Sequence, residues 1–320
     1  GGKRFRALMA HVGYALSSET PIEEVSLPHL SAALELYQAS ALVHDDIIDK
    51  ADERRGMPTP HRTLADHHAA RSWIGSSTDF GRHSAILVGD FLFSAATAAA
   101  DEQALTLHED CARAFVRRFA DMHAEVALGQ YLDITAEQIP LDPERTDALS
   151  VSDSLEVALH KSAHYSVVHP ALLGAICAAP SFDRVTGLLD VLETILTPWG
   201  LAFQLRDDDL GVFGDPAVTG KPAGDDLREG KRTALLALTW EASSPAERRA
   251  LTDVLGVADA STEQIAAATD IVERNGRAAH EAEIARLVAD GDAALEASTF
   301  DEGARAMLRE LCSILTARRS

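Results

Sequence analysis

Two acidic clusters stand far apart in the chain and could do chemistry together. The first runs from Asp45 to Asp49 and is followed by Arg54 to Gly56, and the second runs from Asp207 to Asp209 and is followed by Lys221 and Lys231. Magnesium takes oxygen ligands and is usually held by one or two carboxylates together with substrate phosphates. Two such clusters on separate helices, each with basic residues nearby, predict a site that holds Mg²⁺ and a diphosphate.

Within the first cluster, helix geometry separates the aspartates. Asp45 and Asp49 are four residues apart and share a helix face, so both can reach the same metal ions. Asp46 is rotated by about 100° from Asp45, and we expect it to support the metal ligands. A solvated acidic helix end is the alternative, but apolar residues 41–43 and 47–48 indicate a buried helix, where unpaired carboxylates are costly. Metal ions are the natural partners.

The chain resembles the trans-isoprenyl diphosphate synthases, or polyprenyl synthetases. Asp45 to Asp49 resembles their DDxxD motif, with RRG following. Phe203 to Asp208 resembles FQxxDD, and Gly220 to Thr233 resembles the GKPxGxDLxxGKxT tail. Gly1 to Arg6 matches GGKRxR, and Lys161-Ser162 stands where the family usually has Lys-Thr. These matches extend past position 230 and are most like bacterial geranylgeranyl diphosphate synthases.

The resemblance implies the isoprenoid synthase fold, a single-domain, all-α helical bundle around a central cavity, spanning residues 1–320. It also implies further helices before Gly1, because the family usually has them ahead of GGKR. The pattern alone agrees, since apolar residues recur at helical spacing almost everywhere and strand-like runs are lacking. We expect the helices to be interrupted at residues 18–28, 56–60, 75–81, 140–143, 180–182, 211–224 and 243–245.

The activity that the resemblance implies is a head-to-tail prenyl transfer. An allylic diphosphate ionises with metal assistance, the double bond of isopentenyl diphosphate attacks the cation, and a proton is lost to the released diphosphate. Such chemistry needs cations around the leaving group and a dry cavity. The family implies about three Mg²⁺ ions in each site, with Mn²⁺ as a substitute.

The resemblance also assigns roles to individual residues. The metal ligands would be Asp45, Asp49 and Asp207, supported by Asp46 and Asp208. Lys161, Ser162 and Gln204 would line the region of the cation. Isopentenyl diphosphate would be held by Lys3, Arg6, Gln38 and Arg55, and the allylic diphosphate by Arg54, Lys161, Lys221 and Lys231.

The second motif departs from the family's commonest pattern at one position. Gly211 stands four residues after Asp207, where a third aspartate often stands. Asp215 is an unsuitable substitute on a straight helix, because it lies two turns, roughly 12 Å, further along. We therefore expect Asp207 to be the direct ligand there, and the role of Asp209 stays open.

The helix that carries Asp45 should help to set product length. One isoprene unit advances the growing tail by about one helical turn, roughly 5 Å. Ser40 and Ala41, one turn before Asp45, are small, so the product should exceed C15. Tyr37, or Phe91 and Phe93 from a neighbouring helix, could form the floor. Geranylgeranyl diphosphate (C20) is our first choice, with farnesyl or longer polyprenyl diphosphates as alternatives.

The composition of the chain argues against several classes of binding partner. The formal net charge of −21 argues against nucleic acid and anionic lipid surfaces as partners. Three widely spaced cysteines suit a reducing cytoplasm and support neither a disulfide framework nor a zinc site. We expect no integral membrane segment, because the longest apolar stretches end early or are cut by Asp90. The family implies a homodimer, and a chain that begins with Gly-Gly reveals nothing about targeting.

Two other functions compete with the synthase. A class I terpene cyclase shares the first motif and the fold, but usually carries an Asn/Ser/Glu metal motif in place of FQxxDD and does not need Lys3 and Arg6. A non-catalytic partner subunit of a heteromeric synthase tends to lack one or both acidic motifs. Both motifs are present here, which favours the active synthase.

Overall fold

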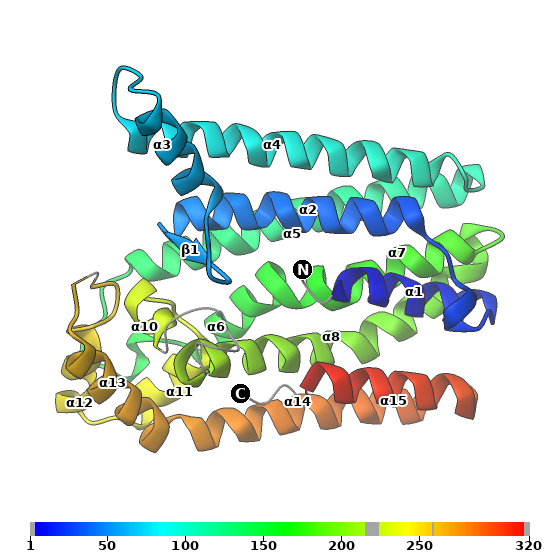
Figure 1. Ribbon diagram of the computed structural model, residues 1–320. Coiled ribbons are helices and arrows are strands. Elements are labelled where there is room, and N and C mark those ends of the chain that lie inside the picture. Colours follow the sequence, from blue (N-terminus) through cyan, green and yellow to red (C-terminus); the bar gives the residue numbers. More distant parts are fainter. Residues whose placement is uncertain (1–3, 215–223, 258, 317–320) are drawn as a thin grey trace. The chain divides into compact units, whose positions relative to one another are not determined.

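The computed structural model describes residues 4–214, 224–257 and 259–316, and helices dominate all three stretches (Figure 1). This confirms the all-α prediction. The α-helices are α1 (Phe5–Ser18), α2 (Pro28–Ile48), α3 (Pro60–Ala70), α4 (Ser77–Ala104), α5 (Glu109–Gln138), α6 (Val151–Ala158), α7 (His169–Ala178), α8 (Phe182–Phe213), α10 (Asp225–Glu229), α11 (Ala234–Ala242), α12 (Pro245–Thr252), α13 (Thr262–Asn275), α14 (Arg277–Ala297) and α15 (Glu302–Thr316). Two 3₁₀ helices, η1 (Ile22–Glu24) and η2 (Thr146–Ala148), and one π-helix, η3 (Leu159–Val168), complete the helical elements.

Contacts divide the chain into two compact units. Unit 1 comprises Gly1–Phe119 and Leu173–Val185, and unit 2 comprises Ala120–Leu172 and Thr186–Ser320. The first acidic cluster belongs to unit 1 and the second to unit 2.

In unit 1, helices α2 and α4 run side by side, and α3 also packs on α4 (Figure 1). Pro28 opens α2 at its first turn, where a missing N–H costs nothing. The hydroxyl of Ser40 donates to the backbone carbonyl of Gly89 at 2.8 Å. A Cβ at Gly89 would meet His44 Nε2 at 2.2 Å, so the His44 side chain packs directly on the backbone of Gly89.

A small hairpin follows α2 and is an addition to the expected all-helical pattern. Strands β1 (Glu53–Arg54) and β2 (Met57–Pro58) are antiparallel, with Arg54 opposite Met57. The two turn residues, Arg55 and Gly56, have φ angles of 57° and 71°. Two successive positive φ values are typical of the type I′ turn, which suits the twist of a two-residue hairpin. The Arg-Arg-Gly sequence is therefore a turn as well as a source of charge.

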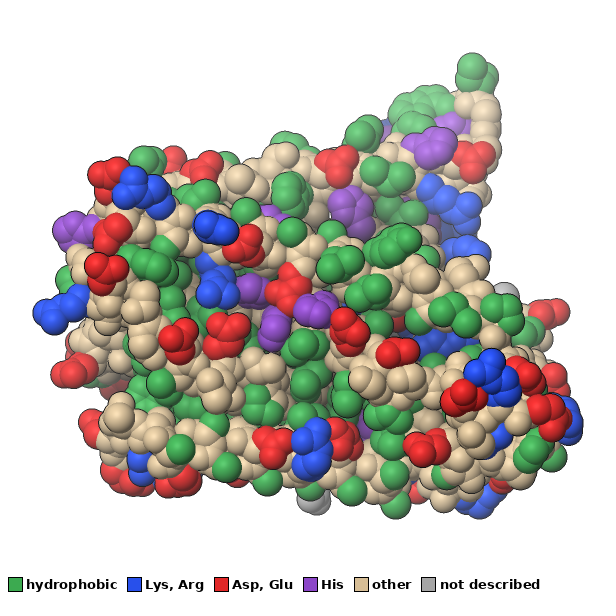
Figure 2. Space-filling view, turned by 180° about the vertical axis from the view of Figure 1, so that it is seen from behind, with side chains coloured by type: hydrophobic (Ala, Val, Ile, Leu, Met, Phe, Trp, Pro, Cys, Tyr) green, Lys and Arg blue, Asp and Glu red, His purple; other side chains and the backbone are tan. Residues whose placement is uncertain are grey.

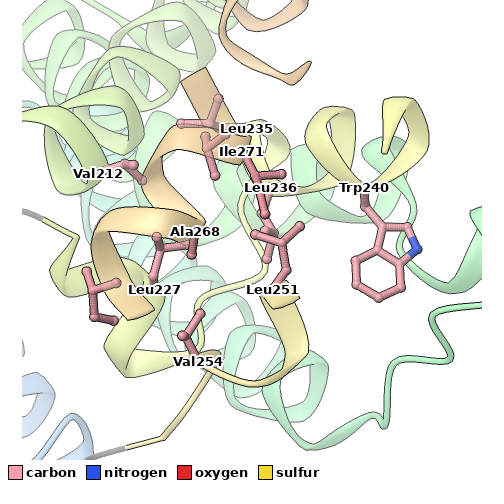
Figure 3. Packing of buried hydrophobic residues seen from close by; sticks show 11 residues of the cluster. Val212, Leu227, Leu235, Leu236, Trp240, Leu251, Val254, Ala268 and Ile271 are labelled. Carbon is pink, nitrogen blue, oxygen red and sulfur yellow. The ribbon is translucent and has the colours of Figure 1, made fainter. Parts of the chain in front are cut away.

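In unit 2, a buried apolar cluster supports the segments around the second acidic motif (Figure 3). It joins Val212 near the end of α8 to Leu227 of α10. The N–H of Gly224 donates to the carbonyl of Val212 at 3.1 Å, so α10 begins beside the last turn of α8. The rest of the cluster comes from α11, α12, α13 and the turn after α12: Leu235, Leu236, Trp240, Leu251, Val254, Ile265, Ala268, Ile271 and Val272.

Helix α4 corrects one expectation from the sequence. It is long and apolar enough, by length and composition alone, to cross a membrane, despite Asp90. Such a helix, taken singly, is weak evidence for a membrane span. Its large apolar side chains nevertheless remain exposed: Ile86, Leu87, Val88, Phe91 and Phe93.

Candidate active site

The first acidic motif lies at the carboxyl end of α2, beside the hairpin. Arg54 Nε donates to Asp46 Oδ1 at 2.6 Å, and Arg54 Nη2 donates to Asp45 Oδ2 at 3.0 Å. The Asp46 side chain is buried, and burial raises the pKa of Asp46 even though Arg54 opposes the shift. Asp46 therefore ties the motif to the hairpin, while Asp49 is the residue directly after the last residue of α2 and caps the helix.

A cavity of about 420 Å³ lies between α2 and the hairpin in unit 1. Asp46, Arg54 and Arg55 supply its charged lining. The other lining residues are Ala39, Leu42, Val43, Met57, Pro58, Thr59 and Pro60. Arginine contacts phosphate in a bidentate way, so Arg54 and Arg55 are the lining residues that could bind an anion, although the Arg54 guanidinium is already paired with Asp45 and Asp46.

The residues predicted to hold isopentenyl diphosphate come from three elements of unit 1. Arg6 lies in the first turn of α1, Gln38 lies near the middle of α2, and Arg55 lies in the hairpin turn. Arg6 and Gln38 are half-buried. Lys3 lies outside the described residues.

The residues predicted to set product length are spread around α2. Tyr37 is buried, and its ring meets that of Phe93 edge to face, with centroids 6.0 Å apart. Ala41 is half-buried. Ser40 is buried at the contact with Gly89 described above, and Phe91 is largely exposed. Tyr37 of α2 and Phe93 of α4 thus pack against each other.

The second acidic motif occupies the last turns of α8 in unit 2. Gln204 Nε2 donates to Asp208 Oδ1 at 2.8 Å. Burial raises the pKa of Asp208 well above its usual range, and the nearby carboxylates of Asp226, Asp207 and Asp133 push it further in the same direction. Asp208 is thus surrounded by other carboxylates, and such a group of oxygen donors suits Mg²⁺, which would relieve the repulsion.

Asp226 supplies a carboxylate that the sequence analysis did not assign. A Cβ at Gly211 would meet Asp226 Oδ2 at 2.0 Å. The carboxylate of α10 therefore lies against the turn of α8 where related chains often have their third aspartate. The nearest signal in the sequence was the Asp225-Asp226 pair in the GKPxGxDL tail, but the sequence could not predict its approach to Gly211.

Asp133 of α5 is the second residue that the sequence analysis missed. It is buried, accepts a hydrogen bond from Lys161 Nζ at 2.5 Å, and lies 3.5 Å from Lys231 Nζ. Burial alone would raise the pKa of Asp133, but the two lysines overcome this and lower it. Two of the lysines predicted to bind diphosphate are thus brought together by one carboxylate. Ser162, next to Lys161 in η3, is half-buried, and Lys221 lies outside the described residues.

Asp209 has a different partner from its two neighbours. Arg277 of α14 contacts it at 3.1 Å, and the Arg277 guanidinium also lies over the ring of Phe213, 4.2 Å from the centroid. Asp209 is buried in these contacts. It therefore links α8 to α14, whereas Asp207 is exposed beside Asp208.

Comparison with known proteins identifies the family. The family model for polyprenyl synthetase matches residues 1–272. The chain belongs to the polyprenyl synthetase family. It is accordingly a prenyltransferase with the isoprenoid synthase fold, as the motifs predicted.

Curated members of the family with sequences similar to this chain differ in their named products. The geranylfarnesyl diphosphate synthase of Aeropyrum pernix is 32% identical over 278 residues, which cover 86% of this chain and 77% of that protein. The geranylgeranyl diphosphate synthase of Mycobacterium tuberculosis is 32% identical over 241 residues, covering 72% of this chain and 57% of that protein. Farnesyl diphosphate synthases also match, at 29% identity. Sequence similarity alone therefore leaves product length open.

A solved structure of the same family is similar along the whole chain. The geranylgeranyl pyrophosphate synthase of Corynebacterium glutamicum, complexed with isoprenyl diphosphate and magnesium, has a TM-score of 0.87 and 37% identity, covering 100% of this chain and 87% of that one. This related protein therefore binds magnesium and isoprenyl diphosphate.

Proposed function

We propose that this protein condenses isopentenyl diphosphate with allylic diphosphates in a Mg²⁺-dependent reaction and releases geranylgeranyl diphosphate. The single observation that carries the proposal is the pair of carboxylate sets, one in each unit, each accompanied by positioned basic side chains. Asp45 and Asp46 form ion pairs with Arg54, and Asp133 forms ion pairs with Lys161 and Lys231. The magnesium complex of the Corynebacterium relative supports the choice of metal.

The roles proposed for the residues follow from this arrangement. Asp45, Asp49 and Asp207 would bind about three Mg²⁺ ions, with Asp46, Asp208 and Asp226 supporting them. When bound, these ions would stabilise the negative charge of the departing diphosphate. Arg54, Lys161, Lys221 and Lys231 would orient the allylic diphosphate, and Lys3, Arg6, Gln38 and Arg55 would orient isopentenyl diphosphate. Gln204 and Ser162 would face the cation.

We propose that side chains of α2 set the chain length of the product. The small side chain of Ala41, one turn from Asp45, would leave space for the tail, and Tyr37, one turn further, would form the floor together with Phe93 of α4. Ser40 is left out of this proposal, because its hydroxyl is engaged at Gly89. Two turns of α2 correspond to about 11 Å, which leaves room for a product beyond C15. A C25 product, as named for the Aeropyrum relative, is the alternative.

The exposed apolar face of α4 supports a homodimer. Leu87 and Phe91 are four residues apart, so they share one face of the helix, and their exposed fractions are 68% and 73%. Contiguous exposed apolar side chains on a protein surface are typical of an interaction site. A second copy of the chain is the proposed occupant of this face.

A cytoplasmic location is proposed as well, supported by the free Cys111, Cys177 and Cys312.

The assay of the purified protein with its proposed substrates tests the function. The protein is incubated with isopentenyl diphosphate and dimethylallyl, geranyl or farnesyl diphosphate, and products are identified by mass spectrometry. We expect linear C20 diphosphate with Mg²⁺ or Mn²⁺ and no product in excess EDTA. Undiminished turnover in EDTA would contradict the metal assignment. Cyclic hydrocarbon would indicate a terpene cyclase, and no turnover by the pure chain would indicate a partner subunit.

Variants of the proposed metal ligands test whether the measured activity depends on this site. Asp45→Ala and Asp207→Ala should each lower kcat by at least about 100-fold, because each removes a metal ligand. Asp66→Ala, at an exposed position of α3, is the control and should retain full activity. Circular dichroism should show unchanged helix content in all three variants.

A further inference from the structure

A cluster of histidines around one glutamate lies in unit 2 and has no part in the proposed reaction. Glu125 of α5 accepts a hydrogen bond at Oε1 from His160 Nδ1 and another at the same oxygen from His164 Nδ1, both at 2.6 Å. His169 Nε2 donates to the other oxygen, Oε2, also at 2.6 Å. Three imidazoles thus converge on one carboxylate.

The π-helix explains how these histidines reach the same partner. In an α-helix with 3.6 residues per turn, residues nine positions apart lie on roughly opposite sides. His160 and His164 lie within η3, and His169 follows directly after it. The wider turn of a π-helix, with its i→i+5 hydrogen bonds, brings residues nine apart back to nearly the same side. Short π-helical segments are rare and occur often at functional sites.

The geometry is that of a metal-binding set. The ligand atoms of Glu125, His160 and His164 all lie within 4.8 Å of one another. The three side chains are partly exposed, at 19%, 28% and 17%, so an ion can reach them. Figure 2 shows histidine side chains gathered beside acidic side chains at the molecular surface.

We propose that Glu125, His160 and His164 form a binding site for a divalent transition-metal ion of the zinc class. Two imidazoles and one carboxylate are a known ligand set for Zn²⁺, with a fourth position left for water. Ligands of a tetrahedral Zn²⁺ lie about 3.3 Å apart, so each imidazole nitrogen would need to move less than about 1 Å away from Oε1 of Glu125.

His169 is the residue that orients the carboxylate. It is almost completely buried, with a side-chain exposure of 6%, and it holds Oε2 while Oε1 faces the other two histidines. Ligating carboxylates and imidazoles are commonly fixed by such outer hydrogen bonds. His123, on the same stretch of α5, lies near His169, and burial, followed by the charge of His169, lowers the pKa of His123 to about 4.

This site is distinct in kind from the magnesium sites of the proposed reaction. Magnesium prefers carboxylate and water oxygens, whereas imidazole nitrogen suits zinc, copper, iron and nickel. The alternative is that Glu125 and its histidines form only a structural hydrogen-bonded network, which binds no metal ion. The inference stands independently of the proposed prenyl transfer, because its test measures binding only.

The test is zinc binding by the full-length chain with saturating Mg²⁺ present, measured by competition with a chromophoric chelator. We expect one Zn²⁺ per chain, with an affinity that falls by more than about 100-fold in His160→Gln/His164→Gln. The single variant Glu125→Gln keeps the size and shape of the side chain but replaces one acceptor oxygen with an NH2 donor and removes the charge, and should also weaken binding. His83→Gln, at an exposed position of α4, is the control and should bind as the unmodified protein does.

Two further results decide between the metal site and the network. Co²⁺ bound to the unmodified protein should give visible d–d absorption typical of a four- or five-coordinate site, and this absorption should be absent from the double variant. The inference is overturned if the unmodified protein binds no Zn²⁺, or if both Glu125→Gln and the double variant bind it with unchanged affinity. Circular dichroism of each variant separates loss of the site from loss of the fold.

Discussion

The basic residues of the site are held by buried aspartates. Arg54 is fixed by Asp46, and Lys161 and Lys231 share Asp133. In a protein of net charge −21, such pairing holds the cationic groups in fixed positions where a diphosphate would bind, while the aspartates offset part of their charge. It also restricts long side chains before the substrate arrives, which lowers the entropy cost of binding. Lys161 and Lys231 therefore act together with a carboxylate, Asp133, that the motif letters do not include, whereas Asp46 is part of DDxxD.

The contact between Asp226 and Gly211 predicts that the Asp226 carboxylate supports Mg²⁺ binding. Asp226→Ala should raise the Mg²⁺ concentration needed for half-maximal rate by about 10-fold or more, since a nearby carboxylate is lost. Gly211→Asp alone should also be harmful, because its side chain would collide with Asp226. The double variant Gly211→Asp/Asp226→Ala should recover much of the loss. Steady-state rates against Mg²⁺ concentration measure this, and full activity of Gly211→Asp alone would contradict it.

His280 predicts how stability depends on pH. It is completely buried, and burial lowers its pKa from 6.5 to about 4. Between these values the unfolded chain takes up a proton that the folded chain refuses, so the free energy of unfolding falls as pH falls from about 6.5 to 4, by up to roughly 3 kcal/mol. Urea unfolding at several pH values should show a shallower decline for His280→Leu. His83→Gln should leave the decline unchanged, and an equal decline in all three proteins would refute the prediction.

At the scale of elements, the hairpin after α2 positions two arginines by backbone conformation. Arg55 has a φ of 57°, which costs energy for a residue with a side chain. Gly56→Ala places its Cβ in open space, so its only cost is backbone strain, about 1 kcal/mol of unfolding free energy. Thermal denaturation measures this cost.

Arg55→Gly separates the charge of the turn from its shape. Glycine accepts a positive φ without strain, so stability should change little, while KM for isopentenyl diphosphate should rise by about 10-fold or more because a charge-assisted phosphate contact is lost. The KM for the allylic substrate should change less. An unchanged KM for isopentenyl diphosphate would remove Arg55 from that site.

Helix α2 is the element that we expect to set the chain length of the product. Ala41→Phe should block the space one turn before Asp45 and shorten the product to C15 or less. Tyr37→Ala should lengthen it, since the Tyr37 and Phe93 pair would lose one ring. Ala32→Phe, at an exposed position of the same helix, should leave the product distribution as it was. Mass spectrometry of the products decides, and an active Ala41→Phe enzyme with unchanged products would show that the tail takes another path.

At the scale of the whole molecule, α4 should lie in a dimer interface. Leu87→Glu/Phe91→Glu would bury two charges without partners, so the dimer should dissociate. Light scattering coupled to size-exclusion chromatography should give twice the chain mass for the unmodified protein and the single mass for the variant. Ile74→Glu changes an almost fully exposed apolar residue outside α4 and should stay dimeric. A monomeric unmodified protein at micromolar concentration would contradict the proposal.

The sequence by itself determined the class of the protein and its helical architecture. DDxxD, FQxxDD and the predicted helix breaks are local patterns, and helix periodicity and metal chemistry can be read over a few residues. The interruptions expected around residues 18–28, 140–143 and 243–245 do separate helices in the structure. The two-residue strands of the hairpin were missed, because such short segments carry almost no periodic signal.

Only the tertiary structure decided which distant residues complete the local patterns. Asp226 lies against Gly211, Asp133 joins Lys161 to Lys231, and Glu125 gathers histidines that begin 35 residues further along the chain. Each pairing depends on how one helix packs on another, and the π-helical phase of η3 depends on that packing too. Contacts of this kind arise from burial and charge compensation between elements far apart in sequence, and no single segment contains the information to predict them.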